Sequence, residues 1–318
     1  MQYRFPVTKK DRGTLLDRFL ASRAGFSLEE ARDLIRFGAV WVNRDRETDG
    51  NRTLETGEDV TLNIPRHGVR RAYEAAPERI LYLDAWVLAY DKEAGVPCQP
   101  TPYDAYNNVY EALRRLGSGG GCSLGEASPT ARGGSRADGT PAGYLAMHHR
   151  LDLGVSGVMV FARSIRANTP LFEAFRDRHV DKAYLAVVCG IPPEDSWEER
   201  APIGRQGGRY LCAEPGKGKE AETAFRVLRR SAGLALVEAR PRTGRTHQIR
   251  LHLARCGLPI LGDRQYGGRP HARCMLHAHR LGLPHPVTGK RLVIEAPLPG
   301  TFHRALEGAS VPRVPQQG

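Results

Sequence analysis

The sequence predicts a mixed α/β protein, in which a small module with two helices precedes a larger domain built on a sheet. Two observations support this prediction. Short runs rich in β-branched residues alternate with helical patterns through the body of the chain, as expected for a mixed sheet with packed helices. Residues 1–64 instead show two helical patterns followed by two strand-like runs. A chain of 318 residues is long enough to bury a core in each part.

The N-terminal part predicts a helix–helix–hairpin module. Apolar residues within 14–22 share one helical face, and a second helix is expected to begin at Ser27. Glu30 stands three residues after Ser27, which is the spacing of a capping box. Strands are expected over 40–43 and 60–64, and the second of these alternates apolar with polar residues.

The rest of the chain is expected to form a linker, a sheet domain and a tail. Arginines and a proline within residues 66–79 indicate a first domain over 1–72 and a linker over 73–79. The sheet domain is expected over 80–302, and a flexible tail over 303–318. The sheet domain is expected to contain strands at 80–90, 158–162, 184–189, 235–239 and 292–295. Helices are expected in it at 170–178 and 246–256.

Residues 117–143 interrupt this domain with a segment of low complexity. The segment consists largely of Gly, Ser, Ala and Thr and has few apolar residues. Such a composition cannot bury enough surface to offset the entropy of ordering. We therefore expect a disordered insertion, and a passive loop is favoured over a mobile flap.

The charge of the chain points to a polyanionic partner. The formal net charge is +12. Arginines crowd one segment in which Glu238 is the single acid, and clustered arginine favours phosphate contact over general solubility. These arginines are Arg229, Arg230, Arg240, Arg242, Arg245, Arg250 and Arg255.

Cysteine usage and hydropathy indicate the compartment. The six cysteines form no Cys-x-x-Cys pair, and residues 1–10 lack the apolar core of a signal peptide. No apolar run approaches the roughly 18 residues that a membrane span needs. We expect a reduced, cytoplasmic monomer that does not contact a membrane.

Two motifs carry the chemistry. The first is His-Arg-Leu-Asp at 149–152, followed by a turn and an apolar strand-like run. The second is the stretch from Thr243 to Ala254, which contains two arginines and two histidines. Further segments of the resemblance are 182–190, Gly262–Asp263, Tyr266–Gly267 and 276–278. The order and spacing of all these segments over roughly residues 80 to 300 resemble the pseudouridine synthases of the RluA type.

The resemblance implies an activity and a fold. Enzymes of this type isomerise uridine to pseudouridine in RNA without metal or cofactor, on a mixed and largely antiparallel sheet. The N-terminal module is similar to the RNA-binding domain of the small-subunit ribosomal protein S-four. Arg32 and Arg36 lie one turn apart on its second predicted helix and are the expected phosphate contacts. Ribosomal RNA of the large subunit is favoured over transfer RNA as the target.

The same resemblance implies three catalytic residues. Asp152 matches the aspartate that attacks either the sugar or the pyrimidine ring, and both routes remain open. Arg250 matches the arginine that holds this carboxylate ionised and oriented. Tyr184 matches a pocket tyrosine whose ring stacks on uracil and whose hydroxyl lies near the departing C5 proton.

Four further residues are expected to bind substrate. Leu276 matches the apolar wall on the other face of the base, and Arg150 matches the residue that enters the space left by a flipped nucleotide. Arg245 is expected to bind phosphate or to support the loop. His247 lies in the same motif and is also assigned to substrate binding.

Other functions fit less well. A non-catalytic RNA-binding protein or ribosome assembly factor could keep this fold, but it would not need all three catalytic residues. Ser156 misses the Gly-x-Ser-x-Gly spacing of a hydrolase by one position, and 216–219 lacks the spacing of a phosphate-binding loop. The spacing of His271, Cys274, His277 and His279 is compatible with zinc, although they fall in a family motif that binds no metal.

The chain departs from the family pattern at two places. Val155 stands where relatives commonly have threonine, and Lys92–Glu93 stands where they commonly have Lys-Pro. Both changes are expected to affect loop geometry and to leave the catalytic residues intact.

Overall fold

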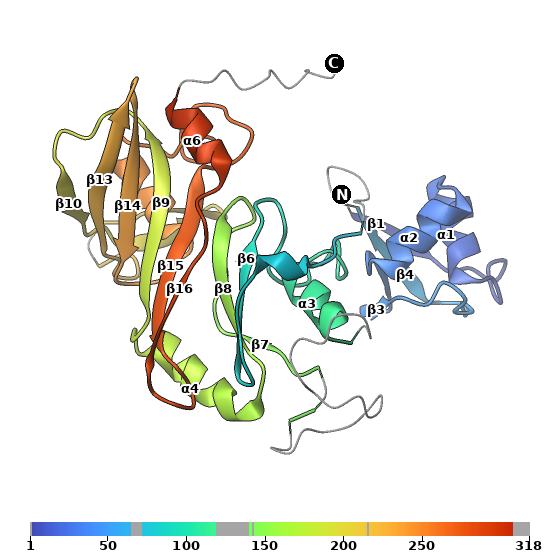
Figure 1. Cartoon of the computed structure of the whole chain (residues 1–318). Coiled ribbons are helices and arrows are strands. Elements are labelled where there is room, and N and C mark those ends of the chain that lie inside the picture. The colour runs from blue at the N-terminus through green and yellow to red at the C-terminus, as the bar shows by residue number, and fades with distance from the viewer. Residues whose placement is uncertain (1, 65–71, 119–139, 142, 215, 308–318) are drawn as a thin grey trace. The chain divides into compact units, whose positions relative to one another are not determined.

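A large mixed sheet dominates the computed structural model, which describes residues 2–64, 72–118, 140–141, 143–214 and 216–307 (Figure 1). The chain divides into a first unit, residues 1–75 with 97–122, and a second unit, residues 76–96 with 123–318. The predicted insertion 117–143 and tail 303–318 lie mainly outside the described residues. Of the tail, residues 303–306 continue the helix α6 (Gly300–Leu306), in which Leu306 is buried.

The sheet of the second unit has ten strands among the described residues. Their order begins β10-β13-β14-β9-β15 and continues β8-β6-β5, while β16 pairs with β15 and β7 with β8. Among these strands, only β15 and β8 pair in parallel, so the predicted mixed, largely antiparallel sheet is confirmed. The strands are β5 (Ile80–Leu83), β6 (Val87–Lys92), β7 (Ala146–Met147), β8 (Ser156–Ala162), β9 (Asp181–Cys189), β10 (Ser196–Glu199), β13 (Thr223–Ser231), β14 (Leu234–Pro241), β15 (Leu276–Pro284) and β16 (Arg291–Glu295).

The predicted strand 80–90 is two strands, because Asp84 makes a turn in its middle. Its Oδ1 accepts hydrogen bonds from the backbone amides of Trp86 and Val87, at 2.7 Å each. An aspartate that bonds amides two and three residues ahead closes a local turn. The chain therefore reverses, and β5 and β6 pair as an antiparallel hairpin.

The helix α4 (Ile165–Arg176) packs on one face of the sheet and starts five residues before the predicted position. Ser164 caps its start, because its hydroxyl accepts a hydrogen bond from the amide of Arg166 at 3.1 Å. Pro170 lies inside the helix. The face below is apolar and includes Val158, Val160 and Leu281.

The remaining elements of the second unit are short. A 3-10 turn at Pro77–Arg79 lies within the predicted linker. The strands β11 (Ile203–Gln206) and β12 (Arg209–Cys212) form a separate hairpin. The helix α5 (Gln248–Arg255) covers most of the predicted helix 246–256.

The first unit combines a four-stranded antiparallel sheet with helices. Its strands are ordered β1-β4-β2-β3, and the capping box of Ser27 and Glu30 is present as predicted. The sequence did not predict the edge strand β1, in which the residues are mostly exposed. The elements are β1 (Gln2–Pro6), α1 (Leu16–Ala24), α2 (Leu28–Arg36), β2 (Val40–Val42), β3 (Asp45–Glu47), β4 (Asp59–Asn63) and α3 (Val109–Ser118).

The sequence assigned residues 97–118 to the sheet domain, but these residues pack in the first unit. The amide of Ala105 donates to the carbonyl of Phe37 at 2.6 Å, and Arg46 donates to the carbonyl of Thr101 at 2.7 Å. The chain thus passes from the first unit to the second and back before it completes the sheet.

Candidate active site

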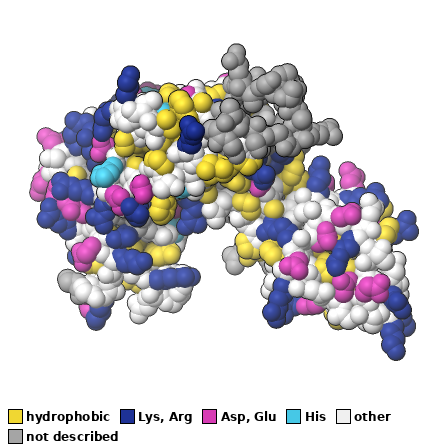
Figure 2. Space-filling model, turned by 90° about the horizontal axis from the view of Figure 1, so that it is seen from below, with side chains coloured by type: hydrophobic (Ala, Val, Ile, Leu, Met, Phe, Trp, Pro, Cys, Tyr) yellow, Lys and Arg dark blue, Asp and Glu magenta, His cyan; other side chains and the backbone are white. Residues whose placement is uncertain are grey.

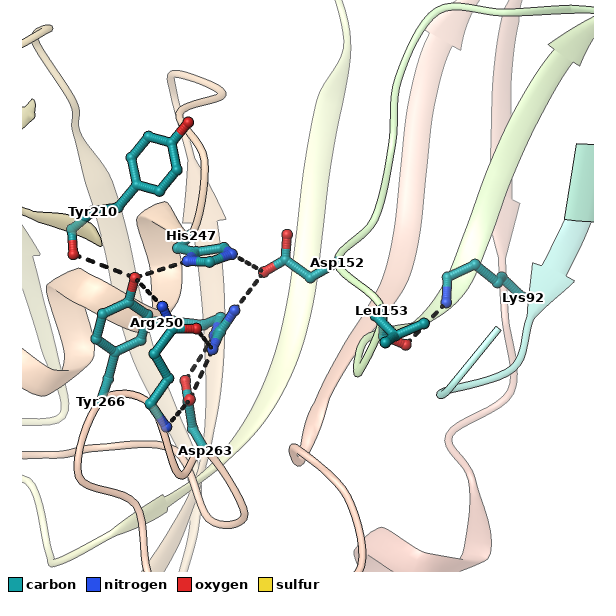
Figure 3. Close-up of polar contacts among 9 residues, drawn as sticks. Lys92, Asp152, Leu153, Tyr210, His247, Arg250, Asp263 and Tyr266 are labelled. Carbon is teal, nitrogen blue, oxygen red and sulfur yellow. Dashed lines mark hydrogen bonds and ion pairs between the residues drawn. The ribbon is translucent and has the colours of Figure 1, made fainter. Parts of the chain in front are cut away.

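Asp152 lies in the loop before β8 and faces α5. Its backbone carbonyl accepts the amide of Val155 at 3.0 Å, which closes a tight turn. Its Oδ2 accepts a hydrogen bond from Arg250 Nη1 at 2.9 Å (Figure 3). The side chain of Asp152 is 30% exposed, whereas that of Arg250 is 11% exposed. The structure therefore brings together two of the three predicted catalytic residues, which lie 98 positions apart.

Arg250 is held mainly by a second carboxylate. Its Nε and Nη2 donate to the two oxygens of Asp263 at 2.7 and 2.8 Å, so the guanidinium fork grips Asp263 and leaves Nη1 for Asp152. Arg250 therefore holds Asp152 through one hydrogen bond and Asp263 through two. Burial alone would lower the pKa of Arg250, but the hydrogen bonds and charge of Asp263, and then of Asp152, raise it well above its usual range.

His247 approaches the same oxygen of Asp152. Its Nε2 lies 3.6 Å from Asp152 Oδ2, and its Nδ1 shares a hydrogen bond of 2.7 Å with the hydroxyl of Tyr266. Burial lowers the pKa of His247, which favours the neutral imidazole. His247 is also a non-glycine residue with a φ of 59°, a conformation that carries strain.

The buried side chain of Gln248 holds the loop in which His247 adopts this strained conformation. The Gln248 Oε1 accepts hydrogen bonds from the Thr243 hydroxyl at 2.7 Å and from the Arg245 amide at 3.0 Å. Its Nε2 donates to the carbonyl of Glu222 at 2.9 Å. These bonds fix the loop 243–248 against β13, so that the loop presents His247 to Asp152.

Tyr184 and Leu276 lie on adjacent strands. The register pairs Tyr184 with Ala278 and Ala186 with Leu276. Opposed residues of an antiparallel pair point to one face, so Tyr184 and Leu276 are diagonal neighbours on the same face of the sheet. This placement is compatible with the predicted roles on the two sides of a base.

The other predicted binding residues differ in how they are held. Arg150 is exposed and makes no ion pair with any described residue. Arg245 donates from Nε to the carbonyl of Glu220 at 2.9 Å, which ties it to the protein backbone. Arg150 is therefore available to a ligand, whereas Arg245 supports the loop.

Sequence reasoning missed the roles of Asp263 and Tyr266. Both stand in short motifs, Gly262–Asp263 and Tyr266–Gly267, that contributed to the resemblance but carried no role. The Tyr266 ring also lies 4.9 Å below the guanidinium carbon of Arg250. Both residues follow closely after α5, which carries Arg250, and this position could have indicated a contact with that arginine.

Lys92 holds the loop that carries Asp152 from the side opposite to Arg250. Its side chain is fully buried, and its ammonium donates to the carbonyls of Glu93 and Val96 at 2.8 Å each. It also lies 3.5 Å from the carbonyl of Leu153, which the amide of Gly95 contacts at 2.7 Å (Figure 3). The turn after β6 thus anchors the residue next to Asp152.

We expect Lys92→Met to destabilise the protein and to slow its reaction. The substitution removes the charged donor to the carbonyls of Glu93 and Val96, at about 1.5–3 kcal/mol per hydrogen bond, so the melting temperature should fall by roughly 5–15 °C. Thermal unfolding and single-turnover kinetics below the melting temperature measure the two effects. An unchanged melting temperature would show that the ammonium does not hold these carbonyls.

Ser156 and His277 form a buried pair that is unsuited to hydrolysis. The Ser156 hydroxyl lies 2.8 Å from His277 Nδ1 and accepts a hydrogen bond from Arg273 at 2.7 Å. Both side chains are almost completely buried. The described residues also contain no cluster of three or more His, Cys, Asp or Glu side chains that could hold a metal. The Ser156–His277 pair instead joins the start of β8 to β15.

The buried state of His277 predicts a pH dependence of stability. Burial lowers its pKa to about 4, against about 6.5 in the unfolded chain. Between these values the unfolded state binds more protons, so stability is lost as pH falls, by roughly 1 kcal/mol per pH unit. Denaturant unfolding of the protein and of His277→Asn from pH 7 to pH 4 measures this, and the variant should show the shallower slope. Equal slopes would contradict the prediction.

The described residues include no helix with the length and apolar character of a membrane span.

Comparisons with known proteins identify the family. The family model described as RNA pseudouridylate synthase matches residues 86–255. An RNA pseudouridine synthase of Mycobacterium bovis is 33% identical, covering 95% of this chain and 96% of the relative. The ribosomal large subunit pseudouridine synthase C of Escherichia coli K12 is 30% identical, covering 95% and 94%. The solved structure of human RNA pseudouridylate synthase domain containing 4 aligns with a TM-score of 0.57 at 24% identity, over 72% of this chain and 92% of that one. The chain therefore belongs to the RNA pseudouridylate synthase family, whose members are isomerases.

Proposed function

We propose that this enzyme isomerises uridines in structured RNA of the large ribosomal subunit, as a cytoplasmic monomer, with Asp152 as its reactive group. The contact between Asp152 and Arg250 carries the proposal. It holds a partly exposed carboxylate beside a largely buried guanidinium that Asp263 has already oriented. A carboxylate placed in this way keeps one direction of attack.

The reaction needs only a carboxylate and proton transfers. The bond between ribose C1′ and uracil N1 breaks, the base rotates, and C1′ bonds to C5; C5 then loses a proton and N1 gains one. Among the described residues, the contacts of the Asp152 carboxylate fall on Oδ2, which leaves Oδ1 for the substrate. Attack on the sugar and attack on the base both use this oxygen.

The neighbouring residues suit a flipped nucleotide. Tyr184 would stack on the uracil with its hydroxyl near the departing C5 proton, while Leu276 would form the opposite wall. Arg150, which is exposed and without an ion pair to any described residue, would enter the space vacated in the RNA. Arg245 would act mainly through its bond to the backbone, and His247 through Asp152.

Large-subunit RNA is supported by similarity and by charge. The Escherichia coli relative is named for the large ribosomal subunit. The net charge is +12, and Figure 2 shows Lys and Arg side chains across the visible face of both units, mixed with acidic ones. Several clustered arginines are ion-paired, for example Arg242 with Glu198 and Glu222, so fewer are free for phosphate than the sequence suggested.

Chemical mapping of pseudouridine tests the proposed target. RNA from cells with and without the gene is labelled, and the sites that disappear identify the substrate. A lost site in large-subunit RNA is the expected result. Loss only in transfer RNA would overturn this target while leaving the chemistry of the family in place.

We also propose that the first unit is an S-four-like RNA-binding domain. Arg32 and Arg36 lie on α2 and keep exposed side chains, although each has a carboxylate partner: Arg32 Nε bonds Asp17 at 2.8 Å and Arg36 bonds Asp33 at 2.8 Å. Asp17 is buried, so Arg32 also stabilises the fold. Arg36 is therefore the cleaner probe of RNA contact.

We expect Arg36→Gln to weaken RNA binding without slowing the chemical step. The dissociation constant should rise about threefold to tenfold, and the slope of its salt dependence should fall by about one. Filter binding at several salt concentrations measures both quantities. Arg12→Gln is the matched control, because Arg12 is also an exposed arginine of this unit with one ion pair. Equal effects of the two variants would argue against a contact at Arg36.

A further inference from the structure

Lys182 lies next to the candidate active site and is not among the catalytic or substrate-binding residues proposed above. It stands on β9 two residues before Tyr184, so the alternation of a strand places both side chains on one face, about 7 Å apart along the strand. Its ammonium lies 5.5 Å from the ring centroid of Phe175 on α4. That ring stacks on His149, three residues before Asp152.

On its other side, Lys182 faces the loop that carries His247. A Cβ atom added to Gly244 would lie 3.7 Å from Lys182 Nζ, and outside the neighbouring residues no other atom of the described residues would come within 4 Å of it. The absence of a side chain at Gly244 thus leaves open space beside the ammonium. Lys182 is therefore placed between the two segments that meet at Asp152.

The charge of Lys182 is not compensated within the described part of the chain. The ammonium of Lys182 makes no hydrogen bond and no ion pair with a described residue, and burial lowers its pKa. Burial lowers the pKa of nearby His149 to about 3, and the positive charge of Lys182 adds to this effect. A largely buried ammonium without an anion costs free energy, and such groups are typical of binding sites.

We propose that Lys182 binds a phosphate group of the RNA that flanks the target uridine. This rests on the proposed RNA substrate, because phosphate is the anion that every nucleotide brings. A uracil stacked on Tyr184 places its own backbone within reach of the same face. A lysine ammonium accepts phosphate from many directions, which suits a backbone that must move as the base rotates. Open space at Gly244 gives the phosphate room.

The test is a double-mutant cycle between the protein and the RNA. An RNA fragment that contains the uridine found by mapping is made in three forms: unmodified, with a neutral methylphosphonate on the 5′ side of the uridine, and with one on its 3′ side. Lys182→Met removes the charge at similar length. Lys290→Met is the control, because Lys290 is an exposed lysine in the turn between β15 and β16.

On unmodified RNA, Lys182→Met is expected to lower kcat/KM about 10- to 100-fold, as for loss of a charged hydrogen bond. On one of the two methylphosphonate RNAs the same substitution should cost less than about twofold, since the contact is already lost. Lys290→Met should have no effect on any of the RNAs. Gly244→Ala, which places a methyl in the open space, should also impair unmodified RNA more than that methylphosphonate RNA.

Other results would overturn the proposal. Equal losses on all three RNAs would mean that Lys182 touches neither flanking phosphate. A shifted pH–rate profile with unchanged RNA affinity would instead make Lys182 a proton acceptor. If Lys182→Met does not fold, Gly244→Ala gives the same comparison. Failure of the parent enzyme to modify any RNA fragment would count against the proposed function and not against Lys182 alone.

Discussion

Asp152→Asn is expected to reduce pseudouridine formation by about a thousandfold or more. Asparagine keeps the shape of the side chain and can still meet Arg250, but it cannot attack the substrate as a carboxylate does. RNA binding should be preserved, because Asp152 carries a negative charge that contributes nothing to holding phosphate. Single-turnover assays with excess enzyme separate the chemical rate from binding.

Two further measurements make this result informative. Thermal unfolding should show little change, because the Asp152 side chain is 30% exposed and Arg250 keeps its partner Asp263. A formation rate within tenfold of the parent enzyme would remove Asp152 from the reaction. The non-catalytic assembly-factor alternative predicts differently: cells that carry Asp152→Asn would then assemble ribosomes normally and keep the same modifications as the parent cells.

Local patterns predicted the elements that depend on neighbouring residues. The capping box of Ser27 and Glu30 involves residues three apart, and the structure has both of its hydrogen bonds. The strand β8 was visible as an apolar run because both of its faces are buried. By contrast, β13 and β15 carry arginine and histidine, and their strand character comes from pairing with distant strands.

The candidate site was predictable in part, and by resemblance more than by physics. Family motifs placed Asp152 and Arg250 together, and the structure has them at 2.9 Å. The same motifs gave no reason for Asp263 to take the fork of Arg250. In the sequence, Lys92 cannot be distinguished from an ordinary lysine at the end of a strand. Its role depends on carbonyls that converge only after β6 and the loop at Leu153 have met, which no local pattern encodes.

We expect Arg250→Lys to be far more damaging than Arg245→Lys. Arg250 uses Nε and Nη2 for Asp263 and Nη1 for Asp152, three directions that one lysine ammonium cannot reproduce. The rate at saturating RNA should fall by about 100-fold or more, since both carboxylates lose their orientation. Among the described residues, the Arg245 side chain makes a single hydrogen bond, to the carbonyl of Glu220. A lysine can also make this bond, so a change of less than about threefold is expected.

The single-turnover rate and the RNA affinity of Arg250→Lys show whether Arg250 orients Asp152 or only contacts phosphate. If Arg250 bound only phosphate, Arg250→Lys would weaken RNA affinity and keep a normal single-turnover rate at saturation. Orientation of Asp152 predicts the reverse, a slow rate with unchanged affinity. Because Asp263 is almost fully buried, the variant should also unfold at a lower temperature, and assays belong well below that point. Equal and mild effects of the two lysine variants would show that the geometry of Arg250 does not matter to the reaction, and the role assigned to its contact with Asp152 would be wrong.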